Sequence, residues 1–249
     1  MAKLFTNTYP FVNLYKKASF KSQIVTQIIY GDSFSIIKKN NRWLKIRIKE
    51  DNYLGFIQNK NYKSYLKPTH KINKLKVKVF KHPNKRKKIN LLTFGSKIRV
   101  TKKQSKFLKF EKGWVKQNET KLLNYKEKNP FKRINIFKNI KYKWGGKSFK
   151  GIDCSALIQV FLNFNNKYCP RDTKDQFRYF KKNIKLKNIK KNDIIFWKGH
   201  VAVALSKNKL IHAYGPMKKT VIMSINQTIK RIKKISKRTF PKAQNHQVN

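Results

Sequence analysis

An internal repeat in the first half of the chain restricts this half to two similar small units in tandem. Three motifs recur in the same order at offsets of about sixty residues, as repeated supersecondary units do. LYK (14–16), YG (30–31) and GFIQ (55–58) are echoed by VFK (79–81), FG (94–95) and GWVK (113–116). PTHK (68–71) contains a proline and marks the break between the two units.

Each repeat is expected to consist of short β-strands. SFSII (33–37) and WLKIRI (43–48) alternate apolar and polar residues, as half-buried strands do. Short polar turns separate these runs, and a helical period is absent from the sequence before residue 128. The pattern resembles bacterial SH3-like domains. We therefore predict two small all-β barrels, at residues 1–66 and 67–124.

The second half of the chain has a different pattern, with helices first and strands later. Apolar residues at three-residue steps after Pro130 predict a short helix over 130–140, and the long apolar run CSALIQVFLNF (154–164) predicts a buried helix. Strands are expected at DIIFW, HVAVAL, KLIHAY and TVIMSI after residue 193, followed by a closing helix over 226–234. This order predicts an α+β domain at residues 128–249.

The charge of the chain is extreme, with 62 Lys and Arg against 10 Asp and Glu among 249 residues, or +52 in total. So many cations would release counterions from a phosphate polymer, which favours nucleic acid or another anionic surface as a partner. Lysine is nevertheless spread over every segment, and the densest run, KRKK (85–88), falls in an expected turn. A compositional bias explains this spread equally well, so nucleic acid stays open as a partner without being favoured.

Compartment and redox state follow from what the sequence lacks. The N-terminal residues have no apolar core of signal-peptide length, and no run approaches the roughly 18 apolar residues of a membrane span. We therefore expect a cytoplasmic protein, with export by another route as the alternative. Cys154 and Cys169 make no disulfide framework and are expected to be free thiols. The sequence does not determine the oligomeric state.

Cys154 stands at the predicted start of the buried helix, after the Gly-rich stretch WGGKSFKGID (144–153). Backbone N–H groups and the positive end of the helix dipole converge there, which favours a thiolate and would stabilise an oxyanion. This position suits a nucleophile. The competing interpretation is a small buried side chain that only packs, and we assign that role to Cys169.

A nucleophilic thiol needs a base, and the base needs an orienting partner. His200 and His212 lie on successive predicted strands, where a turn would bring them to the same edge of a sheet. His200 is the expected base and His212 the residue that fixes its tautomer. A zinc site built from these histidines and the two cysteines is the alternative, but no Cys-x-x-Cys or His-x-x-x-His spacing supports it.

The motifs around these residues carry a family resemblance. YKWGGKSFKGIDCSALIQVF (142–161), PRDTKDQ (170–176), NDIIFWKGHVAVAL (192–205) and LIHAYG (210–215) occur in the order typical of the NlpC-type cell-wall cysteine peptidases. That family has a papain-like fold. With two preceding SH3-like domains, the chain resembles the subgroup of γ-D-glutamyl-L-diamino-acid endopeptidases, or dipeptidyl-peptidase VI, over nearly its whole length. Ala156 departs from the pattern, which has glycine there.

The resemblance implies roles for five residues. Cys154 would be the nucleophile, His200 the base and His212 its orienting partner, while Asp153 and Tyr142 match positions near the substrate. Asp153 would hold the substrate's free amino end and would also cap the helix. Arg171 and Gln176 match the pattern and are assigned a structural role.

These observations lead to one predicted function and one alternative. The chain is expected to hydrolyse the γ-D-glutamyl–diamino acid bond of short peptidoglycan-derived peptides with a free N-terminal L-Ala, through a thioacyl-enzyme. No metal or organic cofactor is implied. The alternative is a catalytically weak or inactive module that binds an anionic polymer such as murein, teichoic acid or nucleic acid.

Overall fold

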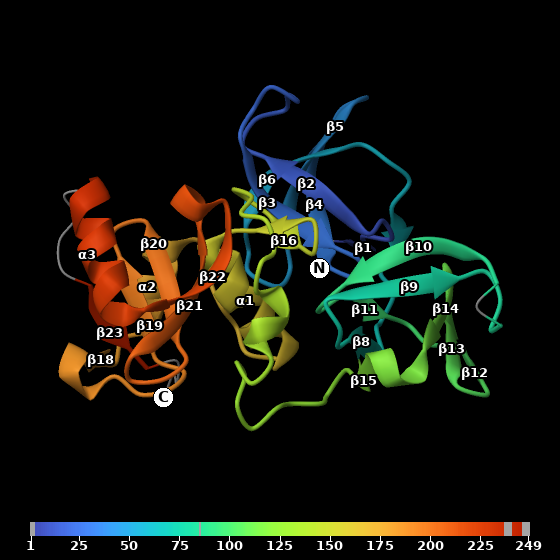
Figure 1. Cartoon of the computed structure of the whole chain (residues 1–249). Helices are drawn as coiled ribbons and strands as arrows, with labels where there is room; N and C mark the ends of the chain where they lie inside the picture. Colours follow the sequence, from blue (N-terminus) through green and yellow to red (C-terminus); the bar gives the residue numbers. More distant parts are fainter. Residues whose placement is uncertain (1–2, 85, 237–240, 246–249) are drawn as a thin grey trace.

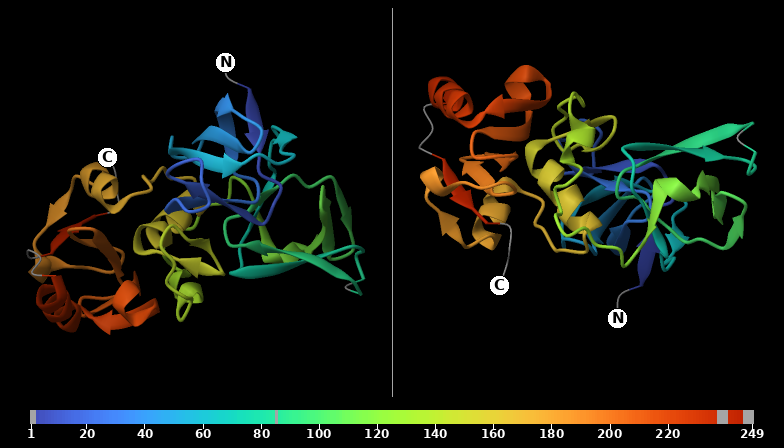
Figure 2. Two further views of the ribbon diagram at one scale, coloured as in Figure 1. Left: turned by 90° about the horizontal axis from the view of Figure 1, so that it is seen from above. Right: turned by 60° about the horizontal axis from the view of Figure 1, so that its bottom comes forward.

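The structure is a computed structural model that describes residues 3–84, 86–236 and 241–245. Strands occupy the first half of the chain, and the three α-helices found in these ranges all follow residue 153. Figure 1 shows the first β unit in blue, the second in cyan to green, and the C-terminal part in yellow to red, with α1 between the C-terminal sheet and the β units. Figure 2 shows the three parts as adjoining lobes.

The first β unit is one antiparallel sheet whose strand order is β3-β2-β6-β5-β4-β1-β7 in the described chain. Its strands are β1 (Leu4–Thr6), β2 (Phe11–Tyr15), β3 (Ile24–Ile29), β4 (Ser33–Lys39), β5 (Trp43–Ile48), β6 (Leu54–Gln58) and β7 (Lys63–Ser64). Alternation along β5 turns Leu44, Ile46 and Ile48 into one buried apolar cluster. The predicted strands over 33–37 and 43–48 are therefore confirmed.

The second β unit divides into a sheet ordered β10-β9-β14-β13-β12 and a small sheet ordered β11-β8-β15. Its strands are β8 (His70–Ile72), β9 (Lys76–Phe80), β10 (Lys88–Thr93), β11 (Lys97–Ile98), β12 (Lys102–Gln104), β13 (Phe107–Phe110), β14 (Gly113–Lys116) and β15 (Thr120–Leu122). Of the KRKK run, residue 85 lies outside the described residues, and Arg86 to Lys88 are exposed beside the start of β10. That each β unit is an SH3-like barrel with the predicted boundaries stays a prediction.

The sequence repeat has a structural counterpart in how the strands pair. Tyr15 of β2 pairs with Phe56 of β6, and Phe80 of β9 pairs with Trp114 of β14. These four residues occupy matching positions of the repeated motifs. The glycines of the YG and FG motifs also share a conformation, with φ of +84° at Gly31 and +81° at Gly95. The repeat therefore encodes the same strand pairing twice.

Gly31 and Gly95 differ in their surroundings, which yields a stability prediction. A Cβ at Gly31 would stand 2.0 Å from the backbone oxygen of Lys97, whereas one at Gly95 would meet only Ile29 Cδ1 at 3.7 Å. We expect Gly95→Ala to cost about 1–2 kcal/mol for the left-handed backbone alone. Gly31→Ala adds a clash between the two β units and should cost on the order of 3–5 kcal/mol. Urea unfolding of both variants checks this difference, and equal losses would contradict it.

The C-terminal part is built on a sheet ordered β18-β23-β19-β20-β21-β22 within the described residues. Its strands are β18 (Asn183–Ile184), β19 (Ile194–Trp197), β20 (His200–Ala204), β21 (Lys209–Tyr214), β22 (Lys219–Ser224) and β23 (Lys242–Gln244), and a hairpin of β16 (Lys147–Ser148) and β17 (Gly151–Ile152) precedes α1. The helices are α1 (Cys154–Phe164), α2 (Thr173–Tyr179) and α3 (Ile225–Ser236). One apolar cluster joins α1 to Val201 and Val203 of β20, and another joins α3 to Ala202 and Ala204.

Most elements predicted for this half are confirmed, with one difference. The helices at 154–164 and 226–234 and the four strands are present. The helix expected over 130–140 is instead a 3-10 turn at Ile134–Phe137. Apolar residues at strict three-residue steps suit the three residues per turn of a 3-10 helix, and Ile134 and Phe137 are buried. None of the helices in the described ranges is long and apolar enough to cross a membrane.

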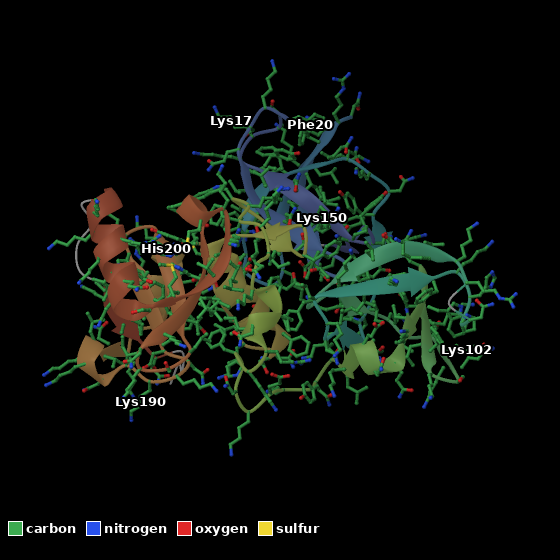
Figure 3. All side chains as sticks on the ribbon, in the orientation of Figure 1. Lys17, Phe20, Lys102, Lys150, Lys190 and His200 are labelled. Atoms are coloured by element: carbon green, nitrogen blue, oxygen red, sulfur yellow. The ribbon has the colours of Figure 1, made fainter. Side chains whose placement is uncertain are left out.

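The positive charge is spread over the surface of the molecule. Figure 3 shows nitrogen-tipped side chains pointing outward along the edges of the view, with Lys17 on the first β unit, Lys102 on the second and Lys190 on the C-terminal part. Lysine side chains therefore lie on all three parts of the molecule.

Candidate active site

The loop before α1 is held by hydrogen bonds that place Cys154 in the first turn of the helix. Asp153 has extended backbone angles, and its Oδ1 accepts a hydrogen bond from the Ala156 N–H at 2.8 Å, as a helix N-cap does. Its Oδ2 accepts a second hydrogen bond from the Gly145 N–H at 2.8 Å. Gly145 has a φ of +69° and lies against the backbone of Ile24, which explains a glycine there. The predicted helix start at Asp153–Cys154 is confirmed.

Asp153 also forms a buried ion pair with Arg171. The Arg171 guanidinium donates through Nη2 to Oδ2 at 2.5 Å and through Nη1 to Oδ1 at 3.1 Å. The remaining Nε–H of Arg171 donates to Thr26 Oγ1 of the first β unit at 2.7 Å. A substrate ammonium would have to share this carboxylate with Arg171, so substrate contact by Asp153 stays a prediction. The structural role expected for Arg171 is confirmed.

Cys154 is buried, with its side chain at the junction of α1, α2 and β20. The backbone of Val201, the residue after His200, forms a hydrogen bond with its sulfur, and Thr173 Oγ1 of α2 lies 4.0 Å from Sγ. Burial, followed by the charge of Asp153, raises the pKa of the thiol to about 11. The expectation that the helix start favours a thiolate is therefore wrong for the resting protein. Loss of water around the sulfur outweighs the hydrogen bonds from Val201 and Thr173 and the charge of Arg171, which act to lower the pKa.

His200 and His212 meet across strands β20 and β21, as their spacing predicted. His200 Nε2 lies 2.8 Å from His212 Nδ1, and both side chains are buried. The His212 ring stacks on Tyr214 at 4.6 Å between centroids and 9° between planes. Burial, with a smaller effect of His200, lowers the pKa of His212 to about 2. Burial therefore disfavours the charged form of His212, and its role as the partner that orients the base stays a prediction. Figure 3 labels His200 in the C-terminal part.

The low pKa of His212 makes the stability of the protein depend on pH. When the pH is below 6.5, the ordinary pKa of histidine, His212 is protonated in the unfolded chain but stays neutral in the folded chain. The free energy of unfolding should therefore fall by about 1.4 kcal/mol per pH unit from this group as the pH drops below 6.5. We expect His212→Asn to remove this part of the acid sensitivity. Urea titrations of both proteins at several acidic pH values check it, and equal slopes would contradict it.

Tyr142 lies beside the segment that leads into α1. Its backbone bridges to Ile152 just before α1, and its N–H donates to Lys218 O at 2.8 Å. Burial, and then the charges of Cys154 and Asp153, raise the pKa of its hydroxyl above the usual value. The structure thus brings Tyr142 within electrostatic reach of the thiol. Its contact with substrate stays a prediction.

A cleft of about 490 Å³ lies in front of Cys154, between the C-terminal part and the first β unit. Cys154, Asp153, Arg171 and Thr173 line one side, and Gln23, Val25 and Tyr53 line the other. The Tyr53 hydroxyl donates to Asp172 Oδ2 at 2.9 Å and connects the two walls. Sequence analysis assigned no role to Tyr53 or Asp172. Asp172 lies within the PRDTKDQ motif, which could have pointed to it, whereas no sequence signal marks Tyr53.

The remaining candidates have structural roles. Cys169 is fully buried in the α1 cluster, which confirms packing, and Gln176 Nε2 donates to the carbonyls of Ser155 and Pro170. Ala156 is fully buried in the same cluster, so its methyl group packs in the core. Within the described part of the chain, no three His, Cys, Asp or Glu side chains gather as metal ligands would.

Both halves of the sequence match known protein families. The NlpC/P60 family model matches residues 139–238, and the model of the bacterial dipeptidyl-peptidase Sh3 domain matches residues 14–61. Dipeptidyl-peptidase 6 of Lysinibacillus sphaericus is 38% identical over 72 residues, which cover 29% of this chain and 27% of that protein. Gamma-D-glutamyl-L-lysine dipeptidyl-peptidase of Bacillus subtilis is 22% identical over 83% of this chain and 77% of that protein.

A crystal structure of an NlpC/P60 family protein from Bacillus cereus shares the fold. It superposes with a TM-score of 0.78 at 16% identity and covers 90% of this chain and 95% of that one. The family match and the peptidase names of these relatives define the class of the protein as a cysteine-type peptidase. The chain belongs to the NlpC/P60 family, and a bacterial dipeptidyl-peptidase SH3 domain precedes its peptidase domain.

Proposed function

We propose that the protein hydrolyses the γ-D-glutamyl–diamino acid bond of short peptidoglycan-derived peptides that carry a free N-terminal L-Ala. The cleft between Cys154 and the first β unit is the observation that carries this proposal. The relative from Bacillus subtilis, whose printed name specifies a γ-D-glutamyl-L-lysine dipeptidyl-peptidase, supports the choice of bond. The diamino acid preferred by this chain is left to experiment.

The proposed reaction proceeds through a thioester on Cys154. His200 takes the proton of the thiol as the sulfur attacks the γ-carbonyl carbon, because a thiol with a pKa of about 11 is protonated at neutral pH. The oxyanion forms beside the first turn of α1. The C–N bond then breaks, and the proton on His200 passes to the leaving amine. Water, deprotonated by His200, attacks the thioester and releases the γ-carboxylate and the thiol.

The first β unit would limit the substrate to short peptides. The hydrogen bond from Tyr53 to Asp172 and that from Arg171 to Thr26 hold this unit against the peptidase part. A long glycan-linked stem would have to pass between these joined walls. In the proposed complex the free amino group lies at this closed end, near the carboxylates of Asp153 and Asp172. An acetyl group there would remove the positive charge and add bulk.

Hydrolysis of L-Ala-γ-D-Glu-meso-diaminopimelate, with and without an N-terminal acetyl group, tests the proposal. We expect release of diaminopimelate from the free-amine peptide only. Equal hydrolysis of both peptides would contradict the proposed requirement for a free N-terminal amino group. If the folded protein hydrolyses neither peptide, the proposed activity is contradicted.

A groove in the second β unit favours a second candidate function, the binding of an anionic polymer of the cell wall. The groove measures about 850 Å³, and Lys106, Lys116 and Lys121 line it together with the half-buried His70. Co-sedimentation with murein sacculi at low and high salt tests this candidate, since binding through charge weakens steeply with salt. Replacing the three lysines by Glu should abolish it, whereas reversing Lys87, Lys88 and Lys103 outside the groove should change it less. Equal effects would indicate general charge attraction only.

The place of the protein in the cell stays a prediction. A recycling role in the cytoplasm and a role in wall remodelling after export both agree with the proposed reaction.

A further inference from the structure

His212 is held by partners on both ring nitrogens. Its Nδ1 faces His200 Nε2 at 2.8 Å, and its Nε2 faces the thioether sulfur of Met223 at 3.4 Å. Met223 lies on β22, two residues beyond Val221, which pairs with His212 across the sheet. Val221 and Met223 therefore point to the same face as His212. That face is covered by the apolar cluster that includes α3.

The chemistry of the thioether decides where the proton of His212 resides. A neutral imidazole carries one N–H and one lone pair, and the thioether of methionine can accept a hydrogen bond but has no proton to donate. The Nε2 atom of His212 must therefore be the donor toward Met223. Its Nδ1 is then the acceptor, and His200 Nε2 must donate to it.

The tautomer of His212 also determines the tautomer of His200, the proposed base. With its proton on Nε2, a neutral His200 keeps the lone pair on Nδ1, the one ring nitrogen that His212 does not use. The opposite tautomer would direct the Nε2 lone pair of His212 at the sulfur lone pairs and would move the His200 proton to Nδ1. The lone pair of His200 would then be on Nε2, where it accepts the N–H of His212, and Nδ1 could not accept the proton of the thiol.

We propose that Met223 is a positioning residue that fixes the tautomer of His212 and, through it, keeps Nδ1 of His200 unprotonated, as the base requires. This inference rests on the proposed function only where it concerns turnover. The assignment of protons is independent of any substrate. A residue that merely filled space could be replaced by another of equal volume without moving either proton.

Nitrogen NMR of the histidine rings tests the assignment directly. The chain has five histidines, and the signals of His212 are identified by their loss in His212→Asn. We expect both His200 and His212 of the wild type to carry their protons on Nε2. Protons on Nδ1 in the wild type would overturn the inference, whether or not any variant folds and whether or not the peptide is hydrolysed.

Replacement of Met223 separates its chemical role from its packing. Met223→Leu keeps the volume but removes the acceptor, and such exchanges are usually tolerated in cores. We expect it to release the His212 proton from Nε2 and to lower kcat on the order of tenfold, as loss of an outer partner of a functional histidine does, with little change in KM.

Met217→Leu is the matched control, since Met217 is 38% exposed and lies outside the site. It should leave the spectrum and kcat unchanged. Wild-type proton positions in Met223→Leu would overturn the inference. If the wild type fails to hydrolyse the peptide, only the proposed function is contradicted, because the spectrum still decides the role of Met223.

Discussion

Cys154→Ala is expected to abolish peptide hydrolysis while leaving the fold intact. Without the sulfur no thioester forms, and loss of a nucleophile of this kind lowers kcat by about 10⁴-fold or more. The substitution removes one buried atom from the start of α1 and leaves the N-cap hydrogen bond from Ala156 to Asp153 in place. Release of diaminopimelate, measured beside the thermal unfolding curve, checks both parts of the prediction.

Cys169→Ala is the matched control for this variant. Cys169 is the other free thiol of the chain, is also buried and has no part in the proposed reaction. It should lose some stability and retain kcat. Substantial turnover by Cys154→Ala, or loss of turnover in folded Cys169→Ala, would show that Cys154 at the start of α1 is not the nucleophile.

Arg171→Met is expected to destabilise the protein by about 3–5 kcal/mol, because it leaves the buried carboxylate of Asp153 without its counterion. The side chains of Arg171 and Asp153 are 1% and 7% exposed. The same carboxylate caps α1, and the same guanidinium reaches Thr26 of the first β unit. Loss of activity should accompany loss of stability, since both walls of the cleft depend on this pair. Urea unfolding measures the effect.

Arg178→Met provides the matched comparison on a neighbouring element. Arg178 and Asp175 form an ion pair on α2 whose side chains are 66% and 54% exposed. Exposed pairs of this kind contribute about 0.5 kcal/mol or less. Similar losses for Arg171→Met and Arg178→Met would contradict the central role assigned to the buried pair.

The fold could be predicted from sequence where one pattern dominates. The repeated motifs predicted two similar units of short strands, and the pairs Tyr15–Phe56 and Phe80–Trp114 show that the two units also share strand pairing. The eleven-residue apolar run predicted α1. The stretch over 130–140 was assigned the wrong kind of helix, because a three-residue step suits a 3-10 turn as well as a short α-helix. Short strands such as β18 and β23 have too few residues to show a period.

The sequence predicted the pairing of the two histidines but not the electrostatics around the thiol. The spacing predicted that His200 and His212 meet on neighbouring strands, and the 2.8 Å between their ring nitrogens confirms that part. The catalytic roles of Cys154, His200 and His212 stay predictions. The thiol pKa was predicted in the wrong direction. A helix start indicates a dipole, whereas burial and the pairing of Asp153 with Arg171 depend on contacts between distant segments. Tyr53 lies 119 residues before its partner Asp172, and no local pattern connects them.

The most direct test of the central claim is the capture of the thioester by hydroxylamine during hydrolysis of L-Ala-γ-D-Glu-meso-diaminopimelate. A thioester on Cys154 reacts with hydroxylamine, so part of the released dipeptide should appear as its γ-hydroxamate. The control incubates the free dipeptide with enzyme and hydroxylamine and should yield none. Our account predicts hydroxamate together with diaminopimelate for the wild type and neither product for Cys154→Ala. Release of diaminopimelate with only free dipeptide at every hydroxylamine concentration would contradict the thioacyl route.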